Sequence, residues 1–238
     1  YLFLNIRGKS VGEEVEVMVT CPDDGETQVP TTINLDEIMV QINNMDIMEV
    51  MSDATNTIAE GEVLQLINSG NPNTNKEQYL EVIYRKTGKL FEAAMVVGGL
   101  LSNQSQTVIN TLQICGKELG MAYQIVDDVL DYSSSFEVMG KDVGDDLSEG
   151  KVTLPMIYAL ERATPDMQDI ISQAILKKDS KDAEKIIACI QSTGSIASSI
   201  NDARDKTEFA LHSMQSLDNS KYKKALISLA EIILHRTY

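Results

Sequence analysis

The chain has 238 residues, 43% of them hydrophobic and 24% charged, and a formal net charge of −16. This composition is ordinary for a globular protein, and the length suits one large domain with or without a small appendage. The negative charge argues against a nucleic-acid partner, because phosphate backbones are bound by clusters of Lys and Arg. No apolar run reaches the roughly 18 residues that span a bilayer, so we expect no transmembrane segment.

The first 38 residues have the period of β-strands. Valines alternate with other residues over 13–20, and 27–35 has a similar pattern. Between them, Cys21–Gly25 contains an Asp-Gly pair, which is typical of a hairpin turn. The sequence therefore predicts a short N-terminal β-hairpin. Because an isolated hairpin is marginal in water, this hairpin must pack on the rest of the chain, pair with another chain or stay poorly ordered.

Downstream, the hydrophobic period changes to that of α-helices. Pro155, Thr164 with Pro165, and Ser180 are placed as helix-start residues. Strand patterns are confined to the front of the chain, so we expect the remainder to be an all-α helical bundle. The expected helices cover residues 39–67, 76–101, 107–132, 152–162, 164–176, 180–191, 195–217 and 220–237.

Three aspartates interrupt the apolar period of the helix expected over 107–132. Asp127 and Asp131 are four residues apart and share one face, and Asp128 flanks them. Like charges at this spacing cost a helix about 0.2–0.5 kcal/mol per pair, and a divalent cation would compensate. Mg²⁺ prefers oxygen ligands and is commonly shared between one or two carboxylates and a phosphate. The alternative is a solvated acidic helix face.

A Gly/Asp-rich segment with two Gly-Lys pairs follows the aspartates. It contains Lys141 and Lys151. Lysines beside an acidic metal site suit a diphosphate, whose charge the cation and the ammonium groups then share. The sequence thus favours a magnesium–diphosphate site over a solvated face.

Other polar residues in the helical part are open to two interpretations. Glu62 and Gln65 are either an exposed pair or residues near a cavity. The small residues Ala93, Ala94, Gly98 and Gly99 either permit close helix packing or line a tunnel for an apolar chain. The three cysteines and two histidines lack partners at metal spacing, which predicts free thiols in a reducing cytoplasm.

Several motifs, in order, resemble those of the trans-polyprenyl diphosphate synthase family. The second aspartate-rich region of that family is similar to Gln124 with 127–131, followed by 140–155. Upstream segments 53–66 and 84–94 also resemble the family. The resemblance covers residues 39–238 and is nearest to the bacterial octaprenyl members, which make ubiquinone side chains. It implies an isoprenoid-synthase-type helical bundle, incomplete in this chain.

The resemblance also implies an activity and its residues. Such enzymes condense isopentenyl diphosphate with an allylic diphosphate by Mg²⁺-dependent ionisation, condensation and proton elimination, and they form homodimers. Asp127, Asp128 and Asp131 would bind metal, with Asp127 the direct ligand. Lys86, Thr87, Gln124, Lys141 and Lys151 would bind the allylic diphosphate, and Asp127, Asp128 and Lys86 would be the catalytic residues.

The sequence departs from the family at its front. The first aspartate-rich motif and the Gly-Gly-Lys diphosphate-binding segment are not among these 238 residues. We therefore expect these residues to have little or no synthase activity on their own. Residues 1–38 instead resemble small baseplate assembly proteins of tailed phages, through 6–12 and 21–25.

Three interpretations follow from the sequence. The chain is a synthase that is truncated or hybrid at its front, with unrelated residues 1–38 joined to the helical part 39–238. Alternatively, it is a non-catalytic helical subunit that pairs with an active synthase, or a phage structural protein. Terpene cyclases share the helical bundle but usually carry a different second metal motif, so Asp-Asp-x-x-Asp favours a synthase.

Overall fold

A computed structural model describes residues 14–20, 28–34, 45–133 and 145–235. The chain divides into two compact units, Tyr1–Met48 and Glu49–Tyr238. In the first unit, β1 (Glu14–Thr20) and β2 (Gln28–Asn34) pair antiparallel, with Val17 opposite Thr31. The turn expected at 21–25 lies outside the described residues.

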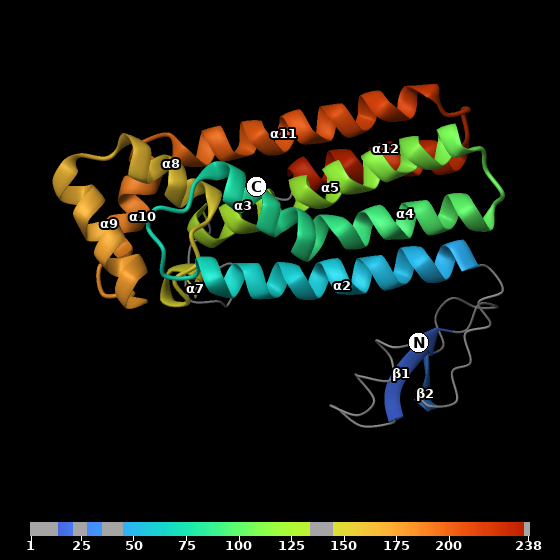
Figure 1. The fold of residues 1–238 in the computed structure, drawn as a ribbon, viewed down its shortest axis with the longest axis horizontal. Helices are drawn as coiled ribbons and strands as arrows, with labels where there is room; N and C mark the ends of the chain where they lie inside the picture. Colours follow the sequence, from blue (N-terminus) through green and yellow to red (C-terminus); the bar gives the residue numbers. More distant parts are fainter. Residues whose placement is uncertain (1–13, 21–27, 35–44, 134–144, 236–238) are drawn as a thin grey trace. The chain divides into compact units, whose positions relative to one another are not determined.

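The described part of the second unit is helical (Figure 1). Long helices run side by side, and the shorter helices α8, α9 and α10 gather at one end of them. Contacts are most extensive between α5 and its neighbours α4 and α11. The elements are α2 (Met45–Asn68), α3 (Lys76–Ile83), η1 (Tyr84–Gly88), α4 (Lys89–Leu101), α5 (Gln106–Ser133), α7 (Asp145–Ser148), α8 (Leu154–Arg162), α9 (Pro165–Lys177), α10 (Ala183–Ser192), α11 (Ser195–Ser213), η2 (Met214–Ser216) and α12 (Lys221–His235).

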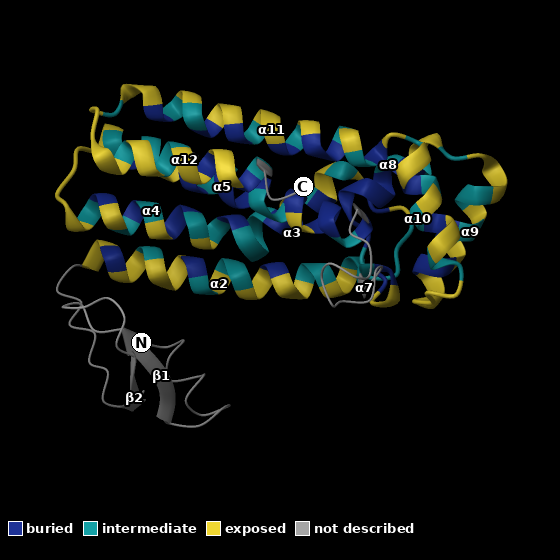
Figure 2. Ribbon diagram, turned by 180° about the vertical axis from the view of Figure 1, so that it is seen from behind, coloured by how far each residue is buried: buried dark blue, intermediate teal, exposed yellow. Residues whose placement is uncertain are grey.

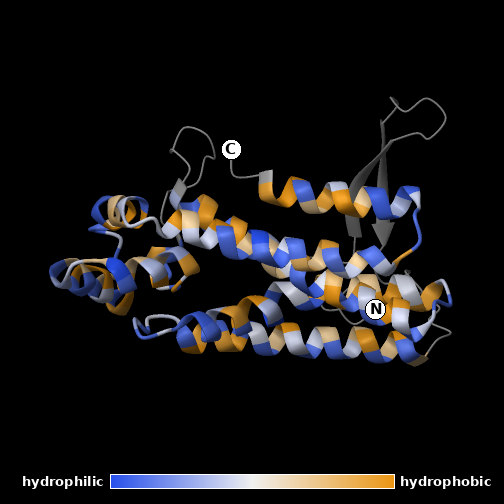
Figure 3. Ribbon diagram, turned by 90° about the horizontal axis from the view of Figure 1, so that it is seen from above, coloured by the Kyte–Doolittle hydropathy of each residue, from blue (hydrophilic) through white to orange (hydrophobic). Residues whose placement is uncertain are grey.

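The core forms around α5. Its residues Ala122, Ile125 and Val126 are completely buried, and they recur at the spacing of one helix face. Figure 2 shows the buried residues gathered on the inward sides of the long helices, with exposed residues along α2 and α11. In Figure 3, hydrophobic and hydrophilic stretches alternate along the same helices, as the helical period in the sequence predicts. The aspartates of α5 thus follow directly after completely buried core residues of the same helix.

Helix boundaries follow the expected start residues in two places. Pro155 and Pro165 each lie in the first turn of a helix, α8 and α9. There the missing N–H of proline removes no hydrogen bond, because the first turn has no helical acceptor for it. Thr164 occupies the N-cap of α9, although its side chain makes no capping hydrogen bond.

Two expected helices differ from the structure. Ser180 does not cap the helix after α9, since Asp182 holds the N-cap position and α10 begins at Ala183. The helix expected over 76–101 contains one π-helical turn, η1, between α3 and α4. A π-turn inserts one extra residue into the helix, and hydrophobic spacing over a few residues does not reveal it.

Candidate diphosphate and metal site

A buried aspartate lies at the centre of the candidate site. The side chain of Asp128 on α5 is only 7% exposed, and each of its oxygens accepts a hydrogen bond. Tyr79 Oη of α3 donates to Oδ2 at 2.6 Å, and Gln124 Nε2 donates to Oδ1 at 2.8 Å. Both donors are neutral groups, so the buried carboxylate has hydrogen bonds but no paired Lys or Arg among the described residues.

The hydrogen bonds continue from α5 to the π-turn. Thr87 Oγ1 donates to Gln124 Oε1 at 2.7 Å. Tyr79, Asp128, Gln124 and Thr87 therefore form one connected chain that joins α3, α5 and η1; we call it the Tyr79–Thr87 relay. The relay brings together three residues that the sequence analysis assigned to metal or diphosphate.

The π-turn carries Lys86 next to Thr87, and two glycines allow it to sit between two helices. A Cβ at Gly61 of α2 would lie 2.7 Å from the backbone nitrogen of Lys86. A Cβ at Gly120 of α5 would lie 2.8 Å from Gly88 Cα. Any larger residue at either glycine would push the helices apart, so close backbone packing fixes the position of Lys86.

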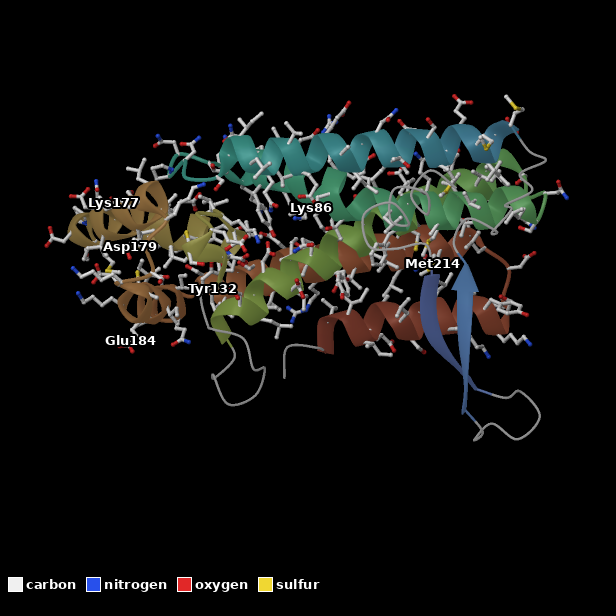
Figure 4. All side chains as sticks on the ribbon, turned by 90° about the horizontal axis from the view of Figure 1, so that it is seen from below. Lys86, Tyr132, Lys177, Asp179, Glu184 and Met214 are labelled. Carbon is white, nitrogen blue, oxygen red and sulfur yellow. The ribbon has the colours of Figure 1, made fainter. Side chains whose placement is uncertain are left out.

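Lys86 is turned toward α2. Its Nζ donates to Gln65 Oε1 at 2.7 Å and lies 3.2 Å from Glu62 Oε2. In Figure 4, Lys86 lies near the middle of the helical unit, whereas Lys177, Asp179 and Glu184 mark the end formed by α9 and α10. Glu62 and Gln65 are therefore partners of a candidate site residue rather than an unrelated exposed pair.

The segment after the aspartates supplies a second lysine. Lys151 Nζ lies 2.6 Å from Glu149 Oε2 and 3.1 Å from Asp146 Oδ1. Burial acts to lower the pKa of Lys151, but its hydrogen bond to Glu149 and the charge of Asp146 outweigh this effect and raise it. The Asp146 N–H in turn donates to Asp131 Oδ2 at 3.3 Å. Lys151 thus lies within one connected group of residues that includes Asp131.

The electrostatics of Asp128 are unusual for a carboxylate. Burial, and then the negative charge of Asp146, raise the pKa of Asp128 to about 7, although the bonds from Tyr79 and Gln124 act in the opposite direction. Burial and the Asp128 charge also raise the pKa of the Tyr79 phenol well above its ordinary value, so it remains a donor. Such a negatively charged region favours a cation.

The three aspartates differ in exposure. Asp127 is exposed, Asp131 is half-buried and Asp128 is buried. Among the described residues, no group of three or more Asp, Glu, His or Cys side chains is arranged around one metal position. A magnesium ion that keeps several waters and shares its coordination with a phosphate needs only one or two carboxylates. The oxygen-rich, negatively charged end of α5 fits such an ion.

The structure connects several of the predicted site residues to one another. Gln124 contacts both Thr87 and Asp128, and Lys86 and Lys151 are each paired with carboxylates nearby in sequence or space. Lys141 lies outside the described residues, and its role remains a prediction. Sequence reasoning missed Tyr79, whose apolar neighbours on the helix indicate an ordinary core residue.

The small residues of α4 favour the packing interpretation at one position. A Cβ at Gly99 would lie 3.1 Å from Ile109 and 3.2 Å from Leu112 of α5. A Cβ at Gly98 would meet nothing within 4 Å. Gly99 therefore serves the α4–α5 contact.

Solved structures share this fold. A polyprenyl synthase from Caulobacter crescentus CB15, complexed with calcium and isoprenyl diphosphate, aligns with a TM-score of 0.80 and 33% identity over 86% of this chain and 63% of that one. A decaprenyl diphosphate synthase from Rhodobacter capsulatus aligns with a TM-score of 0.77 and 35% identity, over 82% and 61% of the two chains. The fold is thus that of the all-α isoprenoid synthases.

Sequence comparison then gives the family. The polyprenyl synthetase family profile matches residues 32–193. The octaprenyl diphosphate synthase of Haemophilus influenzae is 38% identical over 203 residues, and that of Escherichia coli strain K12 is 39% identical over 201 residues. The chain belongs to the polyprenyl synthetase family, which confirms the resemblance seen in its motifs.

The match to these relatives is partial. The chain spans 62% of the length of either octaprenyl diphosphate synthase, while 85% and 84% of the chain is aligned. A second profile, that of the T4 bacteriophage base plate protein, matches residues 1–59. This match agrees with the resemblance of the first 38 residues to phage baseplate proteins. None of the helices in the described ranges is long and apolar enough to cross a membrane.

Proposed function

We propose that the helical part of this chain binds an allylic diphosphate together with Mg²⁺, as part of a trans-polyprenyl diphosphate synthase. The reaction joins that allylic substrate to isopentenyl diphosphate. The carbon–oxygen bond to the diphosphate breaks, a new carbon–carbon bond forms, and loss of a proton restores the double bond. One pyrophosphate is released for each unit added.

The Tyr79–Thr87 relay is the observation that carries this proposal. It joins Thr87, beside Lys86, to Gln124 and Asp128 at the aspartate-bearing end of α5. A lysine, a hydroxyl and an amide next to an anionic cluster match the needs of a diphosphate bound with a cation. The Caulobacter crescentus relative, whose structure contains calcium and isoprenyl diphosphate, supports the same assignment.

Asp127 and Asp131 would hold the metal, with Asp128 adding negative charge behind them. A bound Mg²⁺ supplies charge stabilisation at the departing diphosphate. Lys86 and Lys151 contribute positive charge to the same group, after exchanging their present carboxylate partners for phosphate oxygens. The apolar core around α5 excludes water from the allylic end of the substrate.

Calorimetric titration of the 238-residue chain with pyrophosphate, in the presence of Mg²⁺ or of EDTA, tests the proposal. We expect binding that requires Mg²⁺ and that Asp127→Asn weakens by about a hundredfold, since ligand loss exceeds the 10–100-fold effect of outer-shell changes. Asp166→Asn, at an exposed acid of α9, is the matched control and leaves binding unchanged. Equal affinity with Mg²⁺ and with EDTA would contradict the proposal.

The relation of the two chain regions is a separate part of the proposal. We propose that residues 1–38 are unrelated to the synthase part, 39–238, and that these 238 residues elongate poorly because they contain one aspartate-rich region. The base plate match over 1–59 supports the first statement. Rapid elongation of farnesyl diphosphate by this chain would contradict the second.

A non-catalytic subunit is the second candidate function. As such a subunit, the chain would co-purify with an intact synthase and raise that enzyme's activity. As a synthase, it would form the homodimer expected of the family. Sedimentation of the purified chain, alone and with an intact relative, separates these two outcomes.

A further inference from the structure

We propose that Tyr79 is a positioning residue of the diphosphate site, and that Asp128 acts through the Tyr79–Thr87 relay rather than as a direct metal ligand. This inference rests on the proposed function. It adds a residue that the motif leaves out and assigns Asp128 a role different from those of Asp127 and Asp131.

The geometry of Asp128 indicates that it orients neighbouring side chains rather than binding the metal. Its two oxygens accept from Tyr79 and Gln124 at 2.6 and 2.8 Å, and the residue is almost completely buried. Asp127, by contrast, is exposed. Each Asp128 oxygen already accepts one short hydrogen bond, so an ion would have to reach the remaining lone pairs of a residue that is only 7% exposed.

In its ionised form Asp128 only accepts hydrogen bonds, and this fixes the Gln124 amide. A carboxylate accepts hydrogen bonds, so the amide nitrogen faces Asp128 and the amide oxygen faces the opposite way. That oxygen accepts the single proton of the Thr87 hydroxyl at 2.7 Å. Reversal of the amide would place its oxygen against the ionised carboxylate, and this repulsion sets the orientation, because the Thr87 hydroxyl can either donate or accept.

Tyr79 holds the other end of the relay. Its phenol is 4% exposed and comes from α3, a different element from the aspartates. Without this donor, Asp128 is bonded through one oxygen only and its side chain is less constrained. The Gln124 amide and the Thr87 hydroxyl then lose their fixed orientation beside Lys86, so the site must be ordered by the ligand.

The direct test is Tyr79→Phe, which removes one oxygen and retains the buried ring. We expect Mg²⁺-pyrophosphate to bind about tenfold more weakly, the size of effect seen when a supporting partner is removed. Tyr158→Phe is the matched control, because Tyr158 also donates to a carboxylate, Asp202, at 2.5 Å, but in the α8–α11 contact. It leaves pyrophosphate affinity unchanged. Tyr79→Phe binding as tightly as the unaltered chain overturns the inference.

A separate experiment tests the role of Asp128 by measuring Mn²⁺ affinity from the electron paramagnetic resonance signal of the ion. In the presence of pyrophosphate, Asp128→Asn retains more Mn²⁺ affinity than Asp127→Asn does. Equal losses in the two variants identify Asp128 as a ligand and overturn its assignment to the relay.

A double-mutant cycle tests the relay without any ligand. Tyr79 and Thr87 do not bond to each other, so Tyr79→Phe and Thr87→Val should act independently unless the relay couples them. We expect non-additivity of about threefold or more in the unfolding equilibrium constant. Additive effects overturn the relay. If the unaltered chain binds no pyrophosphate, the proposed function fails, and the cycle alone decides whether the relay exists.

Discussion

Two buried carboxylates in this fold are stabilised in different ways. Glu92 of α4 is 3% exposed and accepts from Tyr84 and Gln113 at 3.0 Å each. It also pairs with Lys89 at 2.8 Å, and Lys89 pairs with Asp53 of α2 at 2.7 Å. Asp128 has two neutral donors and, in the described part of the chain, no paired cation.

This difference separates a structural carboxylate from a candidate functional one. The negative charge of Glu92 is balanced within the protein, and its network joins α2, α4 and α5. Burial and the negative charge of Asp146 raise the pKa of Asp128, and in the described part of the chain no lysine is bonded to it. A buried carboxylate with a raised pKa and no bonded cation is a candidate functional group rather than a structural one.

Removal of Lys89 should leave Glu92, like Asp128, buried without a paired cation. Lys89→Met leaves Glu92 buried without its cation, and we expect a loss of about 3–5 kcal/mol in unfolding free energy. Urea unfolding of the purified variant measures it. The double variant Lys89→Met/Glu92→Gln, which also removes the negative charge, should recover much of the loss. No recovery would show that Lys89 stabilises the fold through packing alone.

The pH dependence of stability should report Asp128. Its pKa in the folded chain is raised to about 7 from an ordinary 3.8, so the folded state binds this proton more tightly than the unfolded state. The associated stability is fully present below about pH 4 and is lost as pH rises through about 7. The full shift corresponds to about 4 kcal/mol.

Urea unfolding at pH 5 and pH 8 compares the chain with Asp128→Asn. We expect the unaltered chain to lose more stability than the variant between these pH values. Since the variant keeps every other titrating group, the difference between the two proteins isolates Asp128. A variant that loses as much stability as the unaltered chain would exclude a raised pKa at this position.

The exposed ion pairs of Arg85 should contribute least to the unfolding free energy. Arg85 lies 2.6 Å from both Glu60 and Glu81, and both acids are largely exposed. Solvent screens such pairs, so Arg85→Met should change the unfolding free energy by only about 0.2–1 kcal/mol. High salt should remove most of this difference. A loss as large as that of Lys89→Met would show that burial is not what separates these ion pairs.

The sequence predicted the helical part well because its signals are local. Pro155 and Pro165 mark helix starts, and the buried face of α5 has a regular period. Asp182 takes the N-cap position rather than Ser180, and both residues, two positions apart, are of types that can begin a helix. Local sequence does not decide between them.

The site was predictable in its motif but not in its connections. Asp127, Asp128 and Asp131 were recognisable from spacing, whereas their different exposure depends on what packs beside α5. Tyr79 is 49 residues from Asp128 in the sequence, and no spacing rule joins residues so far apart. The pairing of Lys86 with Glu62 could not be predicted without the fold. The pairing of Lys151 with Glu149 likewise depends on the turn that follows α7.

The π-turn between α3 and α4 also determines which way the side chains of α4 point around the helix axis. One residue more than a regular helix needs turns the following segment by about 100° around its axis. A single-residue deletion within Tyr84–Gly88 would therefore straighten the helix and rotate Glu92 away from Gln113 while carrying Thr87 off Gln124. Protein engineers who shorten this segment should thus expect the structural carboxylate Glu92 and the Thr87 end of the Tyr79–Thr87 relay to lose partners in one step.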